Sequence, residues 1–200
     1  MQIILASASP RRKALLEALG LRFEVIASDV DEDLKGTPEQ VVTANARAKC
    51  RAVSAQLEWP ALTIGADTVV VLDGHILGKP AGLEEAHIML GRLSGRTHQV
   101  YTGLTVIDSA ASRTAEGVEI TDVTFRSLTS AEIDRFVEAV RPIDRAGAYT
   151  VDGPGSLLVE SYRGCYQNVL GLPIVRLDLL FRELGYSLFS LMDGDRSVFL

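Results

Sequence analysis

The stretch "LTIGADTVVVLDGHIL", residues 62–77, decides the fold of this 200-residue chain. Apolar and β-branched residues continue from 62 to 72, which is typical of a buried strand. The Asp73-Gly74 pair that follows is a strong signal for a two-residue hairpin turn into a second short strand at 75–77. The stretch therefore predicts a hairpin, and with it an antiparallel part of the sheet.

Helical and strand patterns alternate along the rest of the chain. Because their order is not a strict strand–helix alternation, we expect an α/β protein with a mixed sheet. We expect one domain over residues 1–200, with two lobes around a central cleft, and we assign no structure to the tail at 186–200. The expected strands are 3–6, 23–27, 62–72, 75–77, 99–108 and 118–127, and the expected helices are 10–19, 38–57, 83–93, 131–140 and 172–184.

Composition excludes several classes of function. A net charge of −6 and a pI near 5.1 argue against a nucleic-acid coat or a polybasic membrane anchor, since both need a positive face. No apolar run approaches the roughly 20 residues of a membrane span, and Cys50 and Cys165 lie far apart without metal-ligand spacing. We expect a cytoplasmic protein with no nucleic-acid or membrane partner.

The first helix begins with an unusual concentration of positive charge. Ser9 and Pro10 are a well-matched N-cap and first helical residue, but Arg11, Arg12 and Lys13 follow where acidic residues are favoured. Each cation costs this terminus roughly 0.3–1 kcal/mol unless an anion lies in front of it. The free amides, the serine hydroxyls and a guanidinium would suit a polyphosphate; the alternative is three solvated surface cations.

Two carboxylates are candidates for binding the metal ion that would accompany such a polyphosphate. Asp67 interrupts an apolar strand, where an ionised group needs a cation or hydrogen-bond donors beside it. We expect Gly65 and Ala66, just before it, to leave room for a ligand. Glu32 belongs to the acidic run 29–33, of which only one or two members can face a site. Carboxylate oxygens would hold the Mg²⁺ that accompanies a polyphosphate.

Two lysines complete the charged set. Lys49 continues the apolar stripe of the helix at 38–57, so its stem points to the core side, where it either extends to solvent or serves a site. Lys79 lies in a loop just beyond the hairpin, and Pro80 holds it in extended geometry.

These segments, in this order, resemble the Maf family of nucleoside triphosphate pyrophosphatases over residues 3 to about 184. The resemblance rests on nine motifs distributed along the chain. They are "LASASPRR" (5–12), "VDE" (30–32), "ARAK" (46–49), "GADTVV" (65–70), "GKP" (78–80), "LSGRTHQVYTG" (93–103), "DVTFRSLT" (122–129), "DRAGAY" (144–149) and "VLGLPI" (169–174).

The resemblance implies an elongated fold of the inosine-triphosphate-pyrophosphatase type and hydrolysis of a nucleoside triphosphate to the monophosphate and pyrophosphate. It implies a divalent metal, Mg²⁺ or Mn²⁺ with Co²⁺ as a further candidate. The family's motif positions are all present here, at Ser9, Arg12, Glu32, Lys49, Asp67 and Lys79. Asp67 is then the general base or a ligand of the metal, and Glu32 is a metal ligand. The resemblance assigns phosphate binding to Ser9, Arg12, Lys49 and Lys79.

The nucleobase that the protein accepts is inferred from a closer resemblance to the family branch that accepts dTTP and UTP. Arg11, Thr68 and "AGAY" match that branch. One position departs, because Asp152 stands where that branch usually has Gln. A carboxylate can accept the N3–H of thymine or uracil, but it also suits guanine. We therefore expect dTTP and UTP, with modified nucleotides open, and keep a purine or methylated-guanine triphosphate as an alternative.

Other roles stay open at this stage. A nucleotidyl or sugar-phosphate transferase would use similar groups, but it needs a second substrate pocket for which no motif is found. A regulator of septation that binds nucleotide without turnover is another class. For the pyrophosphatase the resemblance implies removal of unwanted nucleotides, with a link to cell-division arrest and a homodimer both left open.

Overall fold

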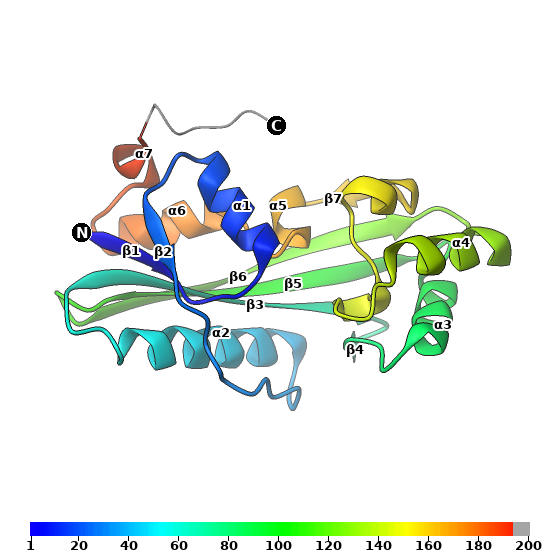
Figure 1. The fold of residues 1–200 in the computed structure, drawn as a ribbon, viewed down its shortest axis with the longest axis horizontal. Coiled ribbons are helices and arrows are strands. Elements are labelled where there is room, and N and C mark those ends of the chain that lie inside the picture. Colours follow the sequence, from blue (N-terminus) through cyan, green and yellow to red (C-terminus); the bar gives the residue numbers. More distant parts are fainter. Residues whose placement is uncertain (194–200) are drawn as a thin grey trace.

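The computed structural model describes residues 1–193 and contains a seven-stranded mixed sheet flanked by helices (Figure 1). The strand order is β2-β1-β3-β5-β6-β7, with β4 paired to β3. The strands are β1 (Gln2–Leu5), β2 (Phe23–Val25), β3 (Ala61–Leu72), β4 (His75–Leu77), β5 (Thr97–Asp108), β6 (Arg113–Phe125) and β7 (Val159–Arg163). The α-helices are α1 (Pro10–Ala18), α2 (Pro38–Ser54), α3 (Leu83–Leu93), α4 (Ser130–Val140), α5 (Tyr166–Val169), α6 (Ile174–Glu183) and α7 (Leu188–Leu191).

The sheet is mixed, as the hairpin predicted. β1 runs parallel to β2 and β3, whereas β3, β4, β5, β6 and β7 pair antiparallel. The turn between β3 and β4 has positive φ at Asp73 (53°) and Gly74 (76°), the two central residues of a type I′ turn. The prediction of an α/β protein with a mixed sheet is confirmed.

Alternate residues of β3 serve opposite faces of the sheet. Leu62, Ile64 and Ala66 pack with α1 and α6 on one face, and α2 covers the other (Figure 1). Gly65 faces α2, and a Cβ there would lie 2.4 Å from the carbonyl oxygen of Ala46. The expectation that Gly65 leaves room for a ligand is therefore wrong, because its missing side chain is what lets the helix approach the strand.

The molecule is elongated because the same long strands support two separate core clusters (Figure 1). One cluster lies under α1 and α6 and includes Leu16 and Phe181. The other lies under α3 and α4 and includes Leu90 and Phe125. β3 contributes to both, with Ile64 in the first and Val70 in the second, as do β5 and β6.

A gap in strand pairing lies between the two clusters. β5 pairs with β3 along residues 62–71, but on the other side β1 reaches only to Ile64 and β4 begins only at Val70. Among the described strands, none pairs with residues 65–69 on that side. The gap leaves Asp67 and Thr68 at an open edge of an otherwise buried strand.

The helix starts follow their predicted caps. Thr37 and Thr129 each form a capping box, with Gln40 and Glu132 respectively. Helix α3 has the predicted bounds, and α1 and α2 begin as predicted but end one and three residues early. β6 begins five residues before the predicted 118 and ends two before 127. The predicted helix 172–184 is shorter, because Pro173 is its N-cap.

No helix or strand was predicted between α4 and α6, and the structure gives this stretch four elements. Two 3₁₀ turns, η1 (Ala146–Ala148) and η2 (Gly153–Leu157), precede β7 and the short helix α5. Part of the unassigned tail is also placed: α7 follows α6, and Met192 forms a β-bridge with Leu21. The rest of that tail, 194–200, lies outside the described residues. No helix within 1–193 is long and apolar enough to cross a membrane.

Candidate active site

A cleft of about 650 Å³ opens at the unpaired edge of β3. Its lining comes from the β1–α1 connection, the β2–α2 loop, α2, β3, the loop after β4 and the segment 144–152. The structure brings all the candidate site residues of the sequence together here. They are Ser9, Arg11, Arg12, Glu32, Lys49, Asp67, Thr68, Lys79 and Asp152.

The buried centre of the cleft is a lysine held between two carboxylates. Lys49 Nζ lies 2.6 Å from Asp67 Oδ1 and 2.6 Å from Glu32 Oε1. Lys49 and Asp67 are only 8% and 4% exposed, so their charges compensate each other out of water. Burial would raise the pKa of Glu32, but the hydrogen bond and charge of Lys49 outweigh it and hold the pKa below its usual value. The stem of Lys49 does point to the core side, and its ammonium lies in the cleft between the two carboxylates.

Asn45, which the sequence analysis missed, holds this centre together. Its Nδ2 donates to Asp67 Oδ2 at 3.1 Å and to the carbonyl oxygen of Asp33 at 3.0 Å. Its Oδ1 accepts from the backbone N–H of Asp33 at 3.1 Å. Asn45 therefore ties the acidic loop to strand β3. The available signal was its position one helical turn before Lys49 on the same face of α2.

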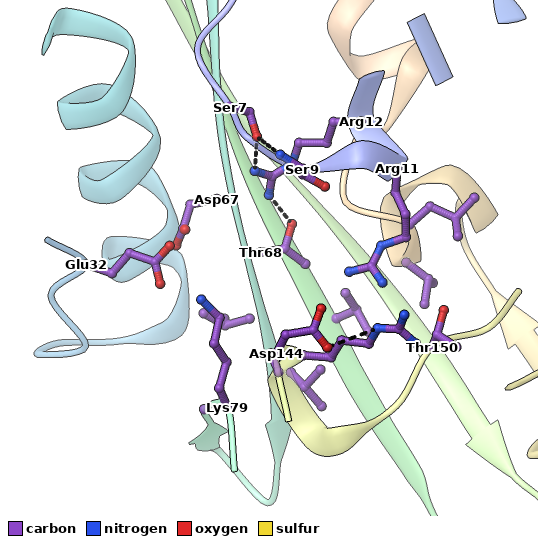
Figure 2. A pocket seen from close by; sticks show the side chains of 18 of the residues that line it. Ser7, Ser9, Arg11, Arg12, Glu32, Asp67, Thr68, Lys79, Asp144 and Thr150 are labelled. Atoms are coloured by element: carbon purple, nitrogen blue, oxygen red, sulfur yellow. Dashed lines mark hydrogen bonds and ion pairs between the residues drawn. The ribbon is translucent and has the colours of Figure 1, made fainter. Parts of the chain in front are cut away.

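Arg12 is the most heavily bonded cation of the cleft. Its Nε donates to the carbonyl oxygen of Gly171 at 2.8 Å, Nη1 to Ser7 Oγ at 3.1 Å and Nη2 to Thr68 Oγ1 at 3.0 Å (Figure 2). Burial lowers the pKa of Arg12, while the charges of Asp67 and Glu32 oppose that change. Arg12 thus links α1, β3 and the turn before α6. Ser7, one of the two serines whose hydroxyls were expected at this helix start, also lines the cleft.

Helix α1 begins at the predicted residue, but only two of its three first-turn cations line the cleft. Ser9 is the N-cap, yet its side chain makes no capping hydrogen bond, so its hydroxyl stays available to the cleft. Arg11 and Arg12 line the cleft, whereas Lys13 forms a surface ion pair with Glu17 at 3.3 Å. The alternative of a solvated surface cation therefore holds for Lys13.

Lys79 approaches the carboxylates from the opposite wall. It lies in the loop after β4, and Figure 2 shows its side chain extending toward Glu32 and Asp67. Its charge is one of the influences that lower the pKa of Glu32. We call Glu32, Lys49, Asp67 and Lys79 the carboxylate end of the cleft.

The other end of the cleft carries two arginines. Figure 2 shows Arg11 from α1 on the side of the cleft where Asp144 and Thr150 lie. The segment 144–152 also contributes Arg145 and Asp152 to the lining. Thr150 Oγ1 donates a hydrogen bond to Asp152 Oδ1, and Arg145 Nε lies 3.5 Å from Asp144 Oδ1. We call Arg11 and these four residues the arginine end.

The donor set at the carboxylate end fits the divalent metal that the resemblance implies. Mg²⁺ is usually held by one or two carboxylates together with substrate phosphates, rather than by an all-protein cage. Glu32 and Asp67 are such a pair, since one ammonium contacts an oxygen of each. Within residues 1–193 no group of three or more His, Cys, Asp or Glu side chains is placed to hold a metal.

Comparison with known proteins agrees with this geometry. The family model described as "Maf-like protein" matches residues 2–184. The dTTP/UTP pyrophosphatase of Pelotomaculum thermopropionicum is 47% identical over 93% of this chain and 98% of its own, and that of Desulforamulus reducens is 48% identical over 92% and 96%.

Solved structures give a much weaker likeness. A nucleoside-triphosphatase / dITP/XTP pyrophosphatase from Mycobacterium abscessus matches with a TM-score of 0.41 and 14% identity, over 64% of this chain and 76% of that one. That similarity is too low to assign a fold, so the relation to inosine-triphosphate pyrophosphatases stays a prediction. The match over nearly the whole sequence, together with the assembled cleft, shows that this chain belongs to the Maf family.

Proposed function

We propose that this protein hydrolyses dTTP and UTP to the nucleoside monophosphate and pyrophosphate. The observation that carries the proposal is the cleft, whose lining combines paired carboxylates, several cations and a set of apolar side chains. Relatives that cover nearly the whole chain are named dTTP/UTP pyrophosphatases. A multiply charged phosphate chain and a base would each find a matching end.

The phosphate chain is assigned to the cations around the carboxylate end. Lys79 has no hydrogen-bond partner among the described side chains, and Ser9 offers a free hydroxyl beside the first-turn amides of α1. Lys49 and Arg12 are already bonded, so they would act by releasing part of their present contacts to the phosphate oxygens. Neutralising the charge that builds on the leaving pyrophosphate is the main contribution expected of these groups.

Asp67 is assigned the role of orienting or deprotonating the attacking water. Its carboxylate is fixed by Lys49 on one oxygen and by Asn45 on the other, so it can orient a water at a set position or accept its proton. Glu32 and Asp67 would hold Mg²⁺ or Mn²⁺, which when bound would polarise a phosphate oxygen and acidify water. The choice between general base and metal ligand for Asp67 stays open.

A panel of triphosphates tests the proposal. Purified protein with Mg²⁺ or Mn²⁺ is expected to release pyrophosphate from dTTP and UTP faster than from other common triphosphates. Asp67→Asn should lower kcat by at least about 100-fold while the thermal unfolding midpoint stays close to that of the unchanged protein. Lys13→Met, on the surface of α1, is the matched control and should keep full activity. A near-normal kcat for Asp67→Asn would remove Asp67 from the mechanism.

One observation favours a second substrate class. The carboxylate of Asp152 lies at the arginine end, where it could accept two hydrogen bonds from guanine. A purine or methylated-guanine triphosphate therefore belongs in the same panel, and faster turnover of such a substrate would replace dTTP and UTP. Tight binding without pyrophosphate release would favour the regulatory role, and a nucleotidyl adduct would favour a transferase.

The cellular setting is proposed on the same grounds. An enzyme of this kind would act on free nucleotides in the cytoplasm, removing those that are unwanted. A homodimer and a link to cell-division arrest stay predictions of the resemblance.

A further inference from the structure

Arg145 is a cation of the cleft that no sequence argument selected. Its Nε and that of Arg11 are buried, and neither has a hydrogen-bond partner within the described part of the chain. The other buried cations differ, since Arg12 makes three hydrogen bonds and Lys49 makes two. Arg145 Nε has an ion pair with Asp144 Oδ1 at 3.5 Å but no hydrogen bond. Buried donors almost always have a hydrogen bond, so two guanidinium Nε groups without one at the same end of a cleft point to an acceptor that a ligand supplies.

The two guanidinium groups also act on each other. Both residues line the cleft, where burial lowers the pKa of Arg11 and the positive charge of Arg145 lowers it further. The nearby carboxylates compensate only in part, because Asp144 meets Arg145 in a 3.5 Å ion pair and Asp152 accepts from Thr150. A group rich in acceptor oxygens between the arginines would relieve the repulsion.

The backbone holds Arg145 firmly in place. It is the N-cap of η1, where Gly147 has φ of 68° and its N–H donates to the carbonyl oxygen of Gly78 at 3.1 Å. A Cβ at Gly147 would lie 3.0 Å from Val70, so the turn packs directly on β3. The Arg145 side chain is therefore presented by a fixed turn, which is what a recognition residue needs.

The walls beside the arginines suit a flat ring. Apolar side chains are part of the cleft lining, and Val70 lies against Gly147 of the same turn, whereas the cations assigned to the phosphates lie toward the carboxylate end. The lining includes Val70, Val100, Val151, Val169 and Leu170. With the phosphates at the carboxylate end, the ring near the arginines is the base.

We propose that Arg145, together with Arg11, donates hydrogen bonds to the carbonyl oxygens of the pyrimidine, so that Arg145 determines the preference for uracil and thymine over cytosine. Uracil and thymine present acceptors at O2 and O4 on either side of the N3–H donor. The arginine end offers the complement, two donors with the acceptor Asp152 beside them. Cytosine carries an amino group at C4, so a hydrogen-bond donor of the base would face a donor of the arginine. The inference rests on the proposed function.

The test compares Arg145→Met with the unchanged protein, using UTP and CTP as substrates. The variant should lose about 10- to 100-fold in kcat/KM for UTP, mainly through KM, and little for CTP. The UTP-to-CTP ratio should therefore collapse. Arg135→Met is the matched control, since Arg135 is exposed on α4 and its nearest acid is 3.4 Å away, and it should leave the ratio unchanged.

A second variant and a binding measurement separate the outcomes. Arg145→Lys keeps the charge but lacks the planar fork, so it should also lower the ratio, and it decides the matter if Arg145→Met fails to fold. An equal loss for both substrates, or an unchanged ratio in either variant, would overturn the inference. Binding of α,β-methylene UTP and CTP is measured in parallel. If the unchanged protein binds the UTP analogue selectively but releases no pyrophosphate from UTP, the proposed function fails, and the variants' binding ratio still tests Arg145.

Discussion

At the scale of single residues, the buried charged groups of the cleft differ in how they are compensated. Asp67 would be costly inside an apolar strand, and Lys49 and Asn45 remove that cost. Arg12 makes three hydrogen bonds to different segments, so it links elements of the fold in addition to its proposed phosphate role. Lys13, one residue further, contacts only Glu17 on the surface.

His98 provides a prediction about pH at this scale. It is 2% exposed, its Nε2 lies 2.7 Å from the hydroxyl oxygen of Tyr149, and burial lowers its pKa from 6.5 to about 4. Between pH 6.5 and about 4, the unfolded chain therefore binds a proton at His98 that the folded chain does not bind. The stability contributed by neutral His98 is complete above pH 6.5 and is lost as the pH falls toward 4.

Between pH 7 and pH 5 this group should remove about 2 kcal/mol from the free energy of unfolding. Urea unfolding at both pH values measures the loss. His98→Gln, which can still hydrogen-bond to Tyr149, should show a loss smaller by that amount. Equal pH dependence in the two proteins would mean that His98 does not carry the effect.

At the scale of elements, the acidic loop is ordered by a helix rather than by its own sequence. Asn45 on α2 makes two hydrogen bonds to the backbone of Asp33 and one to Asp67. Asn45→Ala should lower the free energy of unfolding by about 1–3 kcal/mol, because it leaves buried groups unsatisfied. It should also lower kcat and speed proteolytic cleavage within residues 28–36.

The control for that experiment lies on the same helix. Glu39→Ala removes an exposed side chain from the first turn of α2 and should change unfolding by only a few tenths of a kcal/mol. Limited proteolysis with mass spectrometry locates the cleavage sites. Unaltered cleavage in Asn45→Ala would show that the loop does not depend on this anchor.

The contact between α2 and β3 gives a second prediction at this scale. A Cβ at Gly65 would lie 2.4 Å from the Ala46 carbonyl oxygen and 2.6 Å from the Cβ of Cys50. Gly65→Ala should therefore destabilise the protein by about 1–3 kcal/mol or more, since helix and strand must separate. Gly91→Ala in α3 is the matched control: nothing lies within 4 Å of its Cβ position, and it should stabilise by up to about 1 kcal/mol. Urea unfolding of both variants decides the point.

At the scale of the whole molecule, the cleft lies between two core clusters that share three strands. Because β3, β5 and β6 each contribute side chains to both clusters, neither cluster can lose its packing without disturbing the strands of the other. We therefore predict that the chain unfolds as one cooperative unit, in agreement with the expectation of a single domain.

Two truncations test this cooperativity. Phe125→Ala and Phe181→Ala each remove a fully buried ring, one from each cluster, and each should cost about 3–5 kcal/mol. Both should shift one and the same transition, with equal midpoints by circular dichroism and by fluorescence of Trp59. Two transitions, each sensitive to only one of the variants, would show that the lobes unfold independently.

Which residues line the cleft was largely predictable, because the sequence shows where residue types conflict with their local setting. A carboxylate within an apolar strand and cations at a helix start are such conflicts, and Asp67, Arg11 and Arg12 do line the cleft. Asn45 and Arg145 show no local conflict, so only their partners, 12 to 22 residues away for Asn45 and on α1 for Arg145, reveal their importance.

By itself, the sequence determined the mixed α/β class, the hairpin at Asp73-Gly74 and the starts of the capped helices, since these depend on neighbours within a few residues. Only the tertiary structure decided that one ammonium joins Glu32 and Asp67, that Gly65 accommodates a helix, and that residues 141–171 close the far end of the cleft. The reason is physical: the first group rests on local backbone preferences and hydrogen bonds. The second rests on distances between segments that meet only when the sheet is assembled, and no local preference encodes those distances.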